Sequence, residues 1–314
     1  MLALETNYIR VFDAMSKIDQ THKPVMCSEI LKLLRLRPAM VVLDVTIGCG
    51  GHSSRILEQI LPGGRLLGID RDRESLEIAK NALSAFGNAV NLVYGNFRDL
   101  DKIAQMIGID KVDAIIFDLG LSSVQLSDPK RGFSFMLEGP LDMRMDRSSS
   151  IQAYDLINNL NEEEISSILW LFGQERFHDR IAHLLVTERR KTAINTTSQV
   201  ADIVCRAIPP RYYRFSHIHP ATRTFQAIRI AVNRELEALD EGIKKAIELL
   251  KEKARIATLS FHSLEDRIAK INFRSAQTEG KVKIITPKPI RPSTEEMVQN
   301  PSSRSARLRV AERT

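Results

Sequence analysis

Residues 44–57, DVTIGCGGHSSRIL, restrict the fold of this chain more than any other stretch. They place three glycines, at positions 48, 50 and 51, between an apolar run and a segment with helical spacing. A β-branched apolar run that ends in glycines is typical of a buried parallel strand, and a bare backbone lets a ligand approach the following turn closely. The stretch therefore predicts a ligand site at the carboxyl end of a first strand.

Other segments of the chain repeat the pattern of a buried strand. They are residues 64–70, 90–97, 111–120 and 254–261. The first three alternate with helical patterns, which predicts right-handed crossovers and a doubly wound parallel sheet. The alternation stops near residue 120, where helical segments follow one another, one of them with Asn161 and Glu164 spaced for a capping box.

These patterns predict an α/β, Rossmann-like sheet with an inserted helical domain. The sheet domain is expected to be discontinuous, over residues 22–121 and 216–314, and the helical domain to cover 122–215. Residues 1–21 are expected to be an N-terminal extension.

Composition excludes several classes of protein. No apolar stretch approaches the roughly 20 residues that a membrane span needs, and the N-terminus lacks the basic start of a secretory signal. The three cysteines lie far apart, without the spacing of a zinc site or a disulfide framework. We expect a cytoplasmic protein with reduced thiols, no metal and no membrane partner.

The C-terminal segment, residues 281–314, is basic and rich in proline. It holds eight basic and three acidic residues. This composition predicts an extended arm whose arginines, Arg304, Arg307 and Arg309, contact phosphates and position a nucleic acid. A solvated tail without a partner is an equal alternative on charge alone.

The spacing of the glycines leaves two cofactor classes open. Gly48 and Gly50 fit the dinucleotide fingerprint, but Ser53 stands where its third glycine belongs. S-adenosylmethionine (SAM) has no pyrophosphate and needs only the bare turn. Asp70, at the end of the second strand, is expected to accept hydrogen bonds from ribose hydroxyls in either case, or else to favour the next helix as an acid at its N-terminus.

Four further motifs carry a family resemblance. They are DLGLSSVQLSDPKRGFSFMLEGPLDMRMD (118–146), HPATRTFQAIRIAVNREL (219–236), SFHSLEDRIAK (260–270) and NPSSRSARLRVAER (300–313). Together with the glycine stretch they closely resemble the ribosomal RNA small subunit methyltransferase H family, the 16S rRNA cytosine-N4 methyltransferases. The resemblance runs from about His22 to the C-terminus.

The resemblance implies a class I SAM-dependent methyltransferase that modifies N4 of one cytidine, family position 1402, in the decoding region of 16S rRNA. The helical insertion would recognise the RNA. By position in the motifs, the residues that contact SAM would be Gly50, Gly51, His52, Asp70, Phe97, Asp118 and Gln125.

The chemistry requires an acceptor for a proton of the cytosine amine. Asp118 is the candidate catalytic residue, with the carbonyls of Leu119 and Gly120 as rivals, and a role in SAM contact alone is an equal alternative. Arg144 and His262 are candidates for shaping the target pocket.

Two other functions remain open at this point. One is an NAD-dependent oxidoreductase, and the other is a noncatalytic RNA-binding assembly factor that retains the fold. The sequence does not decide whether the protein is a monomer or a homodimer.

Overall fold

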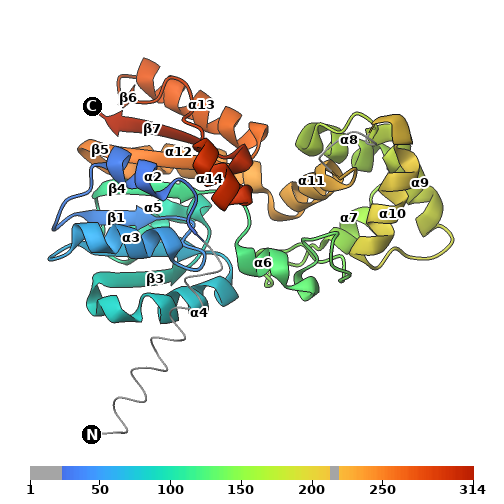
Figure 1. Cartoon of the computed structure of the whole chain (residues 1–314), viewed down its shortest axis with the longest axis horizontal. Helices are drawn as coiled ribbons and strands as arrows, with labels where there is room; N and C mark the ends of the chain where they lie inside the picture. Colours follow the sequence, from blue (N-terminus) through green and yellow to red (C-terminus); the bar gives the residue numbers. More distant parts are fainter. Residues whose placement is uncertain (1–22, 213–218) are drawn as a thin grey trace, which may run out of the picture. The chain divides into compact units, whose positions relative to one another are not determined.

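The computed structural model describes residues 23–212 and 219–314, and these divide into two units. The first unit consists of the described residues through Gly120 together with Glu237–Thr314, and the second is Leu121–Leu236. Figure 1 shows the first unit as a sheet with helices and the second as a group of helices. The predicted α/β fold with an inserted helical domain is confirmed.

A single sheet of seven strands organises the first unit. The strand order is β3-β2-β1-β4-β5-β7-β6. The first five run parallel, and β7 is antiparallel to both of its neighbours. Their bounds are β1 Val41–Asp44, β2 Arg65–Asp70, β3 Val90–Tyr94, β4 Val112–Asp118, β5 Leu250–Ser260, β6 Val282–Ile284 and β7 Arg307–Arg313. All five strands predicted from apolar runs are present.

Helices cover both faces of this sheet. On one face lie α2 Cys27–Leu34, α3 Gly51–Ile60 and α4 Arg73–Ala82, and on the other lie α5 Leu100–Met106, α12 Glu235–Leu249 and α13 Ser263–Thr278. Successive strand residues point to opposite faces, so Val42 packs under the first group and Leu43 under the second. Because both faces are buried there, β1 and β4 are apolar over most of their length.

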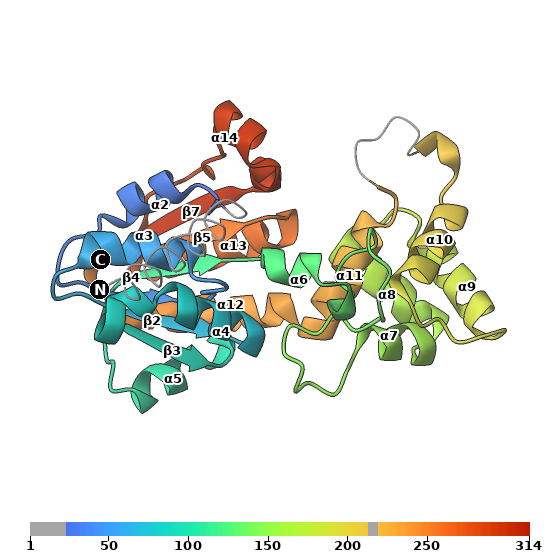
Figure 2. The same ribbon diagram turned by 60° about the horizontal axis from the view of Figure 1, so that its bottom comes forward.

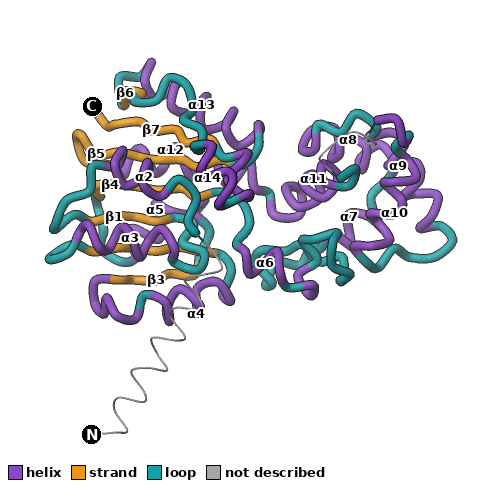
Figure 3. Tube along the Cα trace, viewed as in Figure 1, coloured by secondary structure: helices purple, strands orange, loops and turns teal. Residues whose placement is uncertain are grey.

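The second unit is helical in the part that the structure describes (Figures 2 and 3). Its α-helices are α6 Ser123–Ser127, α7 Ala153–Asn159, α8 Glu162–Gly173, α9 His178–Arg189, α10 Thr197–Ala207 and α11 Thr222–Asn233. The predicted capping box begins α8, since the Asn161 side chain accepts from the Glu164 N–H and the Glu164 carboxylate accepts from the Asn161 N–H. Within residues 23–212 and 219–314, no helix combines the length and apolarity that crossing a bilayer requires.

One predicted domain boundary is wrong. The sequence predicts that the sheet domain resumes at residue 216, which lies outside the described residues, but the second unit includes 219–236. The reason is α11, whose Phe225 and Ile228 share an apolar core with Ile165 and Leu169 of α8. The two helices approach so closely that a Cβ on Gly173 would lie 2.6 Å from the Arg223 carbonyl oxygen.

The prediction of an extended C-terminal arm is also wrong. Residues 281–314 form β6, α14 (Thr294–Gln299), a short 3-10 helix (Pro301–Ser305) and β7, which lies inside the sheet between β5 and β6. Arg309 of β7 is buried, and its guanidinium donates to both carboxylate oxygens of Asp266 at 2.6 and 3.2 Å. Its charge is compensated within the fold.

This pairing predicts the stability of two arginine variants. Arg309→Ala leaves Asp266 without its main partner in a largely buried position, so the free energy of opening at β7 should fall by about 3 kcal/mol. Arg304→Ala removes an exposed side chain and should change the same quantity by less than about 0.5 kcal/mol. Native-state hydrogen exchange of the β7 amides measures both, and equal effects would contradict the assignment.

Candidate active site

The turn between β1 and α3 requires glycine for two reasons. Gly48 and Gly50 have φ of +52° and +87°, the left-handed region that other residues rarely adopt. A Cβ on Gly51 would lie 3.0 Å from the Pro24 side chain, which is tight. At Gly48 a Cβ would meet only the Thr46 carbonyl oxygen, at 3.9 Å, so space remains beside the turn there.

Asp70 ends β2 and fastens this turn. Its Oδ2 accepts from the Gly48 N–H at 2.8 Å and its Oδ1 from the Asp72 N–H at 2.9 Å. Asp72, rather than Asp70, caps α4, so the alternative of Asp70 as a helix-start acid does not describe this site. Burial raises the pKa of Asp70, against the opposing effect of the two N–H donors. Each carboxylate oxygen keeps a second lone pair for a ligand hydroxyl.

Asp118 is the last residue of β4, next to β1 in the sheet. Its backbone N–H donates to the Thr46 hydroxyl at 2.7 Å, and its Oδ2 lies 3.0 Å from Nδ1 of His52, in the first turn of α3. Its Oδ1 is buried and has no hydrogen-bond partner among the described residues. The Asp118 side chain remains 29% exposed. His52 therefore holds one carboxylate oxygen, and the other is buried without a hydrogen-bond partner among the described residues.

The partners of His52 determine how many protons it carries. Nε2 lies 2.9 Å from the Val25 carbonyl oxygen, which can only accept, so Nε2 carries a hydrogen. A neutral ring would then face the carboxylate with the Nδ1 lone pair, which is repulsive. The contact at 3.0 Å thus requires one further proton between Nδ1 and Oδ2, and an imidazolium paired with a carboxylate satisfies it.

Electrostatics favour that ion pair. Burial by itself lowers the pKa of His52, but the Asp118 carboxylate, aided by the Val25 carbonyl, outweighs burial and raises the pKa above its ordinary value of 6.5. The stability that this pairing contributes is complete below about pH 6.5 and is lost as pH rises through the raised pKa. His52, predicted to contact the cofactor, instead uses both ring nitrogens within the protein and orients Asp118.

Asp44 is a buried acid that the sequence prediction missed. It ends β1, and its oxygens accept from the Ser53 hydroxyl at 2.6 Å and from the Thr46 N–H at 3.2 Å. Burial raises its pKa to about 6 despite the Ser53 hydrogen bond. The signal was present, because Asp44 and Asp70 both end strands that flank the glycine turn.

The Phe97 ring is mostly enclosed by its own domain. The ring is buried and packs edge-on against Phe117, with centroids 5.6 Å apart. A Cβ on Gly242 of α12 would lie 2.8 Å from that ring, which shows how closely the helix covers it. Contact between Phe97 and SAM, which the family resemblance implies, therefore stays a prediction, and the ring has a packing role in the sheet domain.

Two of the predicted contacts belong to the second unit. Gln125 is buried in α6, where its side-chain oxygen accepts from the Ser122 N–H at 3.0 Å and completes a capping box. Arg144 donates to both oxygens of Asp142 at 2.8 Å and to the carbonyls of Arg147 and Ser149. This guanidinium braces its own loop, and its role in shaping the target pocket stays a prediction.

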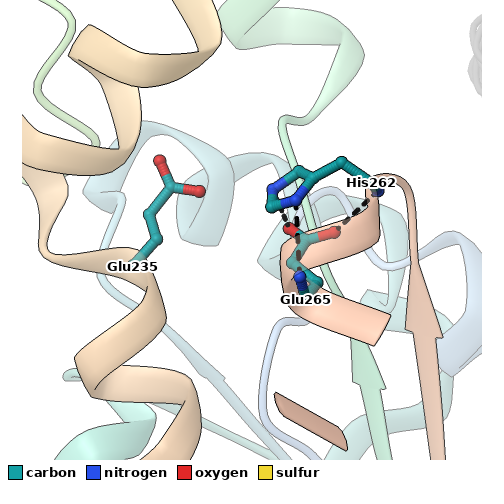
Figure 4. Close-up of side chains that lie close together, drawn as sticks. All are labelled: Glu235, His262 and Glu265. Atoms are coloured by element: carbon teal, nitrogen blue, oxygen red, sulfur yellow. Dashed lines mark hydrogen bonds and ion pairs between the residues drawn. The ribbon is translucent and has the colours of Figure 1, made fainter. Parts of the chain in front are cut away.

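His262 also has a structural role in the first unit. It caps α13, with its Nδ1 accepting from the Glu265 N–H and the Glu265 carboxylate accepting from the His262 N–H. Figure 4 shows this pair at the start of α13. The figure also draws Glu235, which belongs to the second unit and accepts there from Arg229 at 2.9 Å through both carboxylate oxygens. The prediction that His262 shapes a target pocket is not supported.

The three predicted phosphate contacts differ in exposure. Arg304 is exposed, Arg307 is half-buried with a nitrogen 3.9 Å from Asp266, and Arg309 is buried in its pair with the same carboxylate. Only Arg304 presents a free-standing cation to solvent. The prediction that Arg309 contacts phosphate is wrong, because its charge is required inside the sheet.

Residues 19–314 match the model of the MraW methylase family. A relative from Brevibacillus brevis, named ribosomal RNA small subunit methyltransferase H, is 42% identical over 95% of this chain and 100% of its own length. A relative of the same name from Sulfurihydrogenibium sp. is 46% identical over 93% of this chain and 99% of its own length. A solved structure of an rRNA methylase from Streptococcus thermophilus is 11% identical, covers 94% of this chain and 98% of its own, and has a TM-score of 0.43.

The proton count at His52 leads to a spectroscopic prediction. In the wild type at pH 7, both ring nitrogens of His52 should carry protons. In Asp118→Asn the carboxylate is lost and burial dominates, so the pKa should fall below 6.5 and the ring should be neutral with its hydrogen on Nε2.

Nitrogen chemical shifts of the His52 ring, recorded against pH, measure both states. His183, whose side chain is 68% exposed, serves as the internal reference, because it contacts Glu162 and not Asp118. A neutral His52 in the wild type at pH 7 would contradict the ion pair.

Proposed function

The chain belongs to the MraW methylase family, and on that premise we propose that it transfers a methyl group from SAM to N4 of a cytidine in small-subunit rRNA. The relatives' names supply the ribosomal RNA of the small subunit as substrate. The resemblance of the motifs supplies the finer assignment, which is the cytosine amine at family position 1402. A ribosomal RNA substrate is consistent with a cytoplasmic enzyme.

The residues around the glycine turn fit SAM. The space beside Gly48, the second lone pairs on Asp70 and the unpartnered Oδ1 of Asp118 lie at the carboxyl ends of β1, β2 and β4, where open α/β sheets bind ligands. We propose that the turn at Gly50 and Gly51 and the Asp70 carboxylate hold SAM. When bound, SAM supplies an electrophilic methyl group attached to a sulfonium.

Asp118 is the proposed acceptor for the amine proton. The N4 lone pair of cytosine is delocalised into the ring, so a hydrogen bond from N4–H to Oδ1 raises its electron density and fixes its direction. Methyl transfer would form the N4–C bond and break the S–C bond, leaving a neutral thioether, and one N4 proton would pass to Oδ1. His52 holds Oδ2 throughout, so the carboxylate is oriented before the substrate arrives.

One observation carries this assignment. Asp118 has one oxygen fixed by a buried imidazole and the other buried without a partner, at the end of β4. A buried carboxylate oxygen without a partner is costly, so its retention favours a role in contact with a ligand. The Leu119 and Gly120 carbonyls lack this arrangement, and a noncatalytic RNA-binding factor would have no use for it.

Substitution of Asp118 tests the assignment. At saturating SAM, Asp118→Asn should lower kcat for labelled methyl transfer to unmodified 16S rRNA or small subunits at least a hundredfold, about 3 kcal/mol on the barrier. Asp110→Ala is the matched control, because it removes an exposed carboxylate from the loop before the same strand and should leave kcat unchanged.

Three other outcomes have distinct meanings. A raised KM for SAM with an unchanged kcat would reduce Asp118 to a cofactor contact. No transfer by the wild type to either substrate would favour the noncatalytic RNA-binding factor. Calorimetric binding of NADH but not of SAM would overturn the proposed function.

A further inference from the structure

Aromatic and arginine side chains gather on the second unit, where α8 ends, α9 begins and the short 3-10 helix Pro210–Tyr212 lies. Trp170 is 55% exposed and Tyr212 is 41% exposed, although large aromatic rings are normally covered. We call Trp170, Arg176, Phe177, Arg211 and Tyr212 the arginine–aromatic surface. None of them has a part in the proposed chemistry.

Contacts between rings and guanidinium groups join these residues into one surface. Phe177 and Tyr212 meet edge to face with centroids 4.9 Å apart. The Arg176 guanidinium lies 5.1 Å from the Tyr212 ring centroid, and that of Arg211 lies 5.0 Å from it. Trp170 is tied to the same region through His178, the neighbour of Phe177, with ring centroids 5.2 Å apart.

The positive charge of this surface is not neutralised. Among the described residues, Arg176 and Arg211 form no ion pair with a carboxylate. The acids close to them in sequence have other partners, since Glu175 accepts from the Phe177 N–H and Asp179 contacts Ser166 and His178. The surface therefore combines arginines that have no carboxylate partner among the described residues with partly exposed aromatic rings.

This combination matches the chemistry of an unpaired nucleic acid strand. Bases stack on aromatic rings and on guanidinium planes, while arginines neutralise the phosphates between them. A second copy of the chain fits less well, because a two-fold contact would bring the same arginines of both copies together. We infer that the arginine–aromatic surface binds unpaired rRNA. The inference rests on the proposed function, whose substrate is rRNA.

The chain carries a built-in reporter for this inference, because Trp170 is its only tryptophan. Titration of the full-length protein with a single-stranded RNA from the decoding region should quench its fluorescence, and a duplex of the same length should quench it far less. Tyr212→Ala and Arg176→Ala should weaken binding of the single strand about 5- to 100-fold. Tyr212→Phe keeps the ring and should bind as the wild type does.

Arg190→Ala is the charge-matched control, since Arg190 is an exposed arginine at the far end of α9. It should change the affinity less than about twofold, apart from a small salt-dependent loss. In methyl transfer, the surface variants should raise KM for RNA with kcat and KM for SAM unchanged.

Two results would overturn the inference. The first is absence of Trp170 quenching together with unchanged RNA affinity in both alanine variants. The second is sedimentation of a wild-type dimer that Tyr212→Ala dissociates, which would assign the surface to a second copy. If wild type transfers methyl groups but the variants keep its KM for RNA, this inference fails and the proposed function stands. If the wild type binds RNA through this surface but transfers no methyl group, the proposed function fails and this inference stands.

Discussion

The parallel pairing of β2, β1 and β4 is the constraint on which the site depends. Because parallel strands in neighbouring positions end at the same edge, Asp70, Asp44 and Asp118 come together around one turn, although they are far apart in the sequence. The glycines leave that turn without side chains, and Asp70 fastens it through the Gly48 N–H. Carboxylates beside a glycine turn can bind a small ligand that has a positive charge and hydroxyl groups.

The three aspartates at this edge differ in their burial and in their hydrogen-bond partners. Asp44 is buried, which raises its pKa to about 6. It accepts a hydrogen bond from the Ser53 hydroxyl and so links β1 to α3. Asp118 is kept in register by Thr46 and paired with His52, which leaves a single oxygen for a ligand. Residues of one chemical type at one sheet edge thus take separate roles because their hydrogen-bond partners differ.

The sheet was predictable from the sequence because its signals are local. Apolar runs of strand length, the Asn161 capping box and the glycine turn each lie within a few residues, and all are present in the structure. The errors arose where a distant partner decides the outcome. Arg309 is compensated by Asp266, 43 residues earlier, so the charge of its segment said nothing about exposure. The cover of α12 over the Phe97 ring is also a distant contact, which composition near Phe97 cannot reveal.

The motif located His52 at the site, but it did not reveal the contacts of the His52 ring. Its position after the glycines indicated the site, but its ring nitrogens contact Val25 and Asp118 of the neighbouring strand.

The most direct test of the proposed site is a crystal structure with S-adenosylhomocysteine and a cytidine-containing oligonucleotide. We expect S-adenosylhomocysteine to lie beside residues 48–51 and the target N4 to lie about 3 Å from Asp118 Oδ1. A ligand bound elsewhere, or an Oδ1 turned away from the amine, would contradict it.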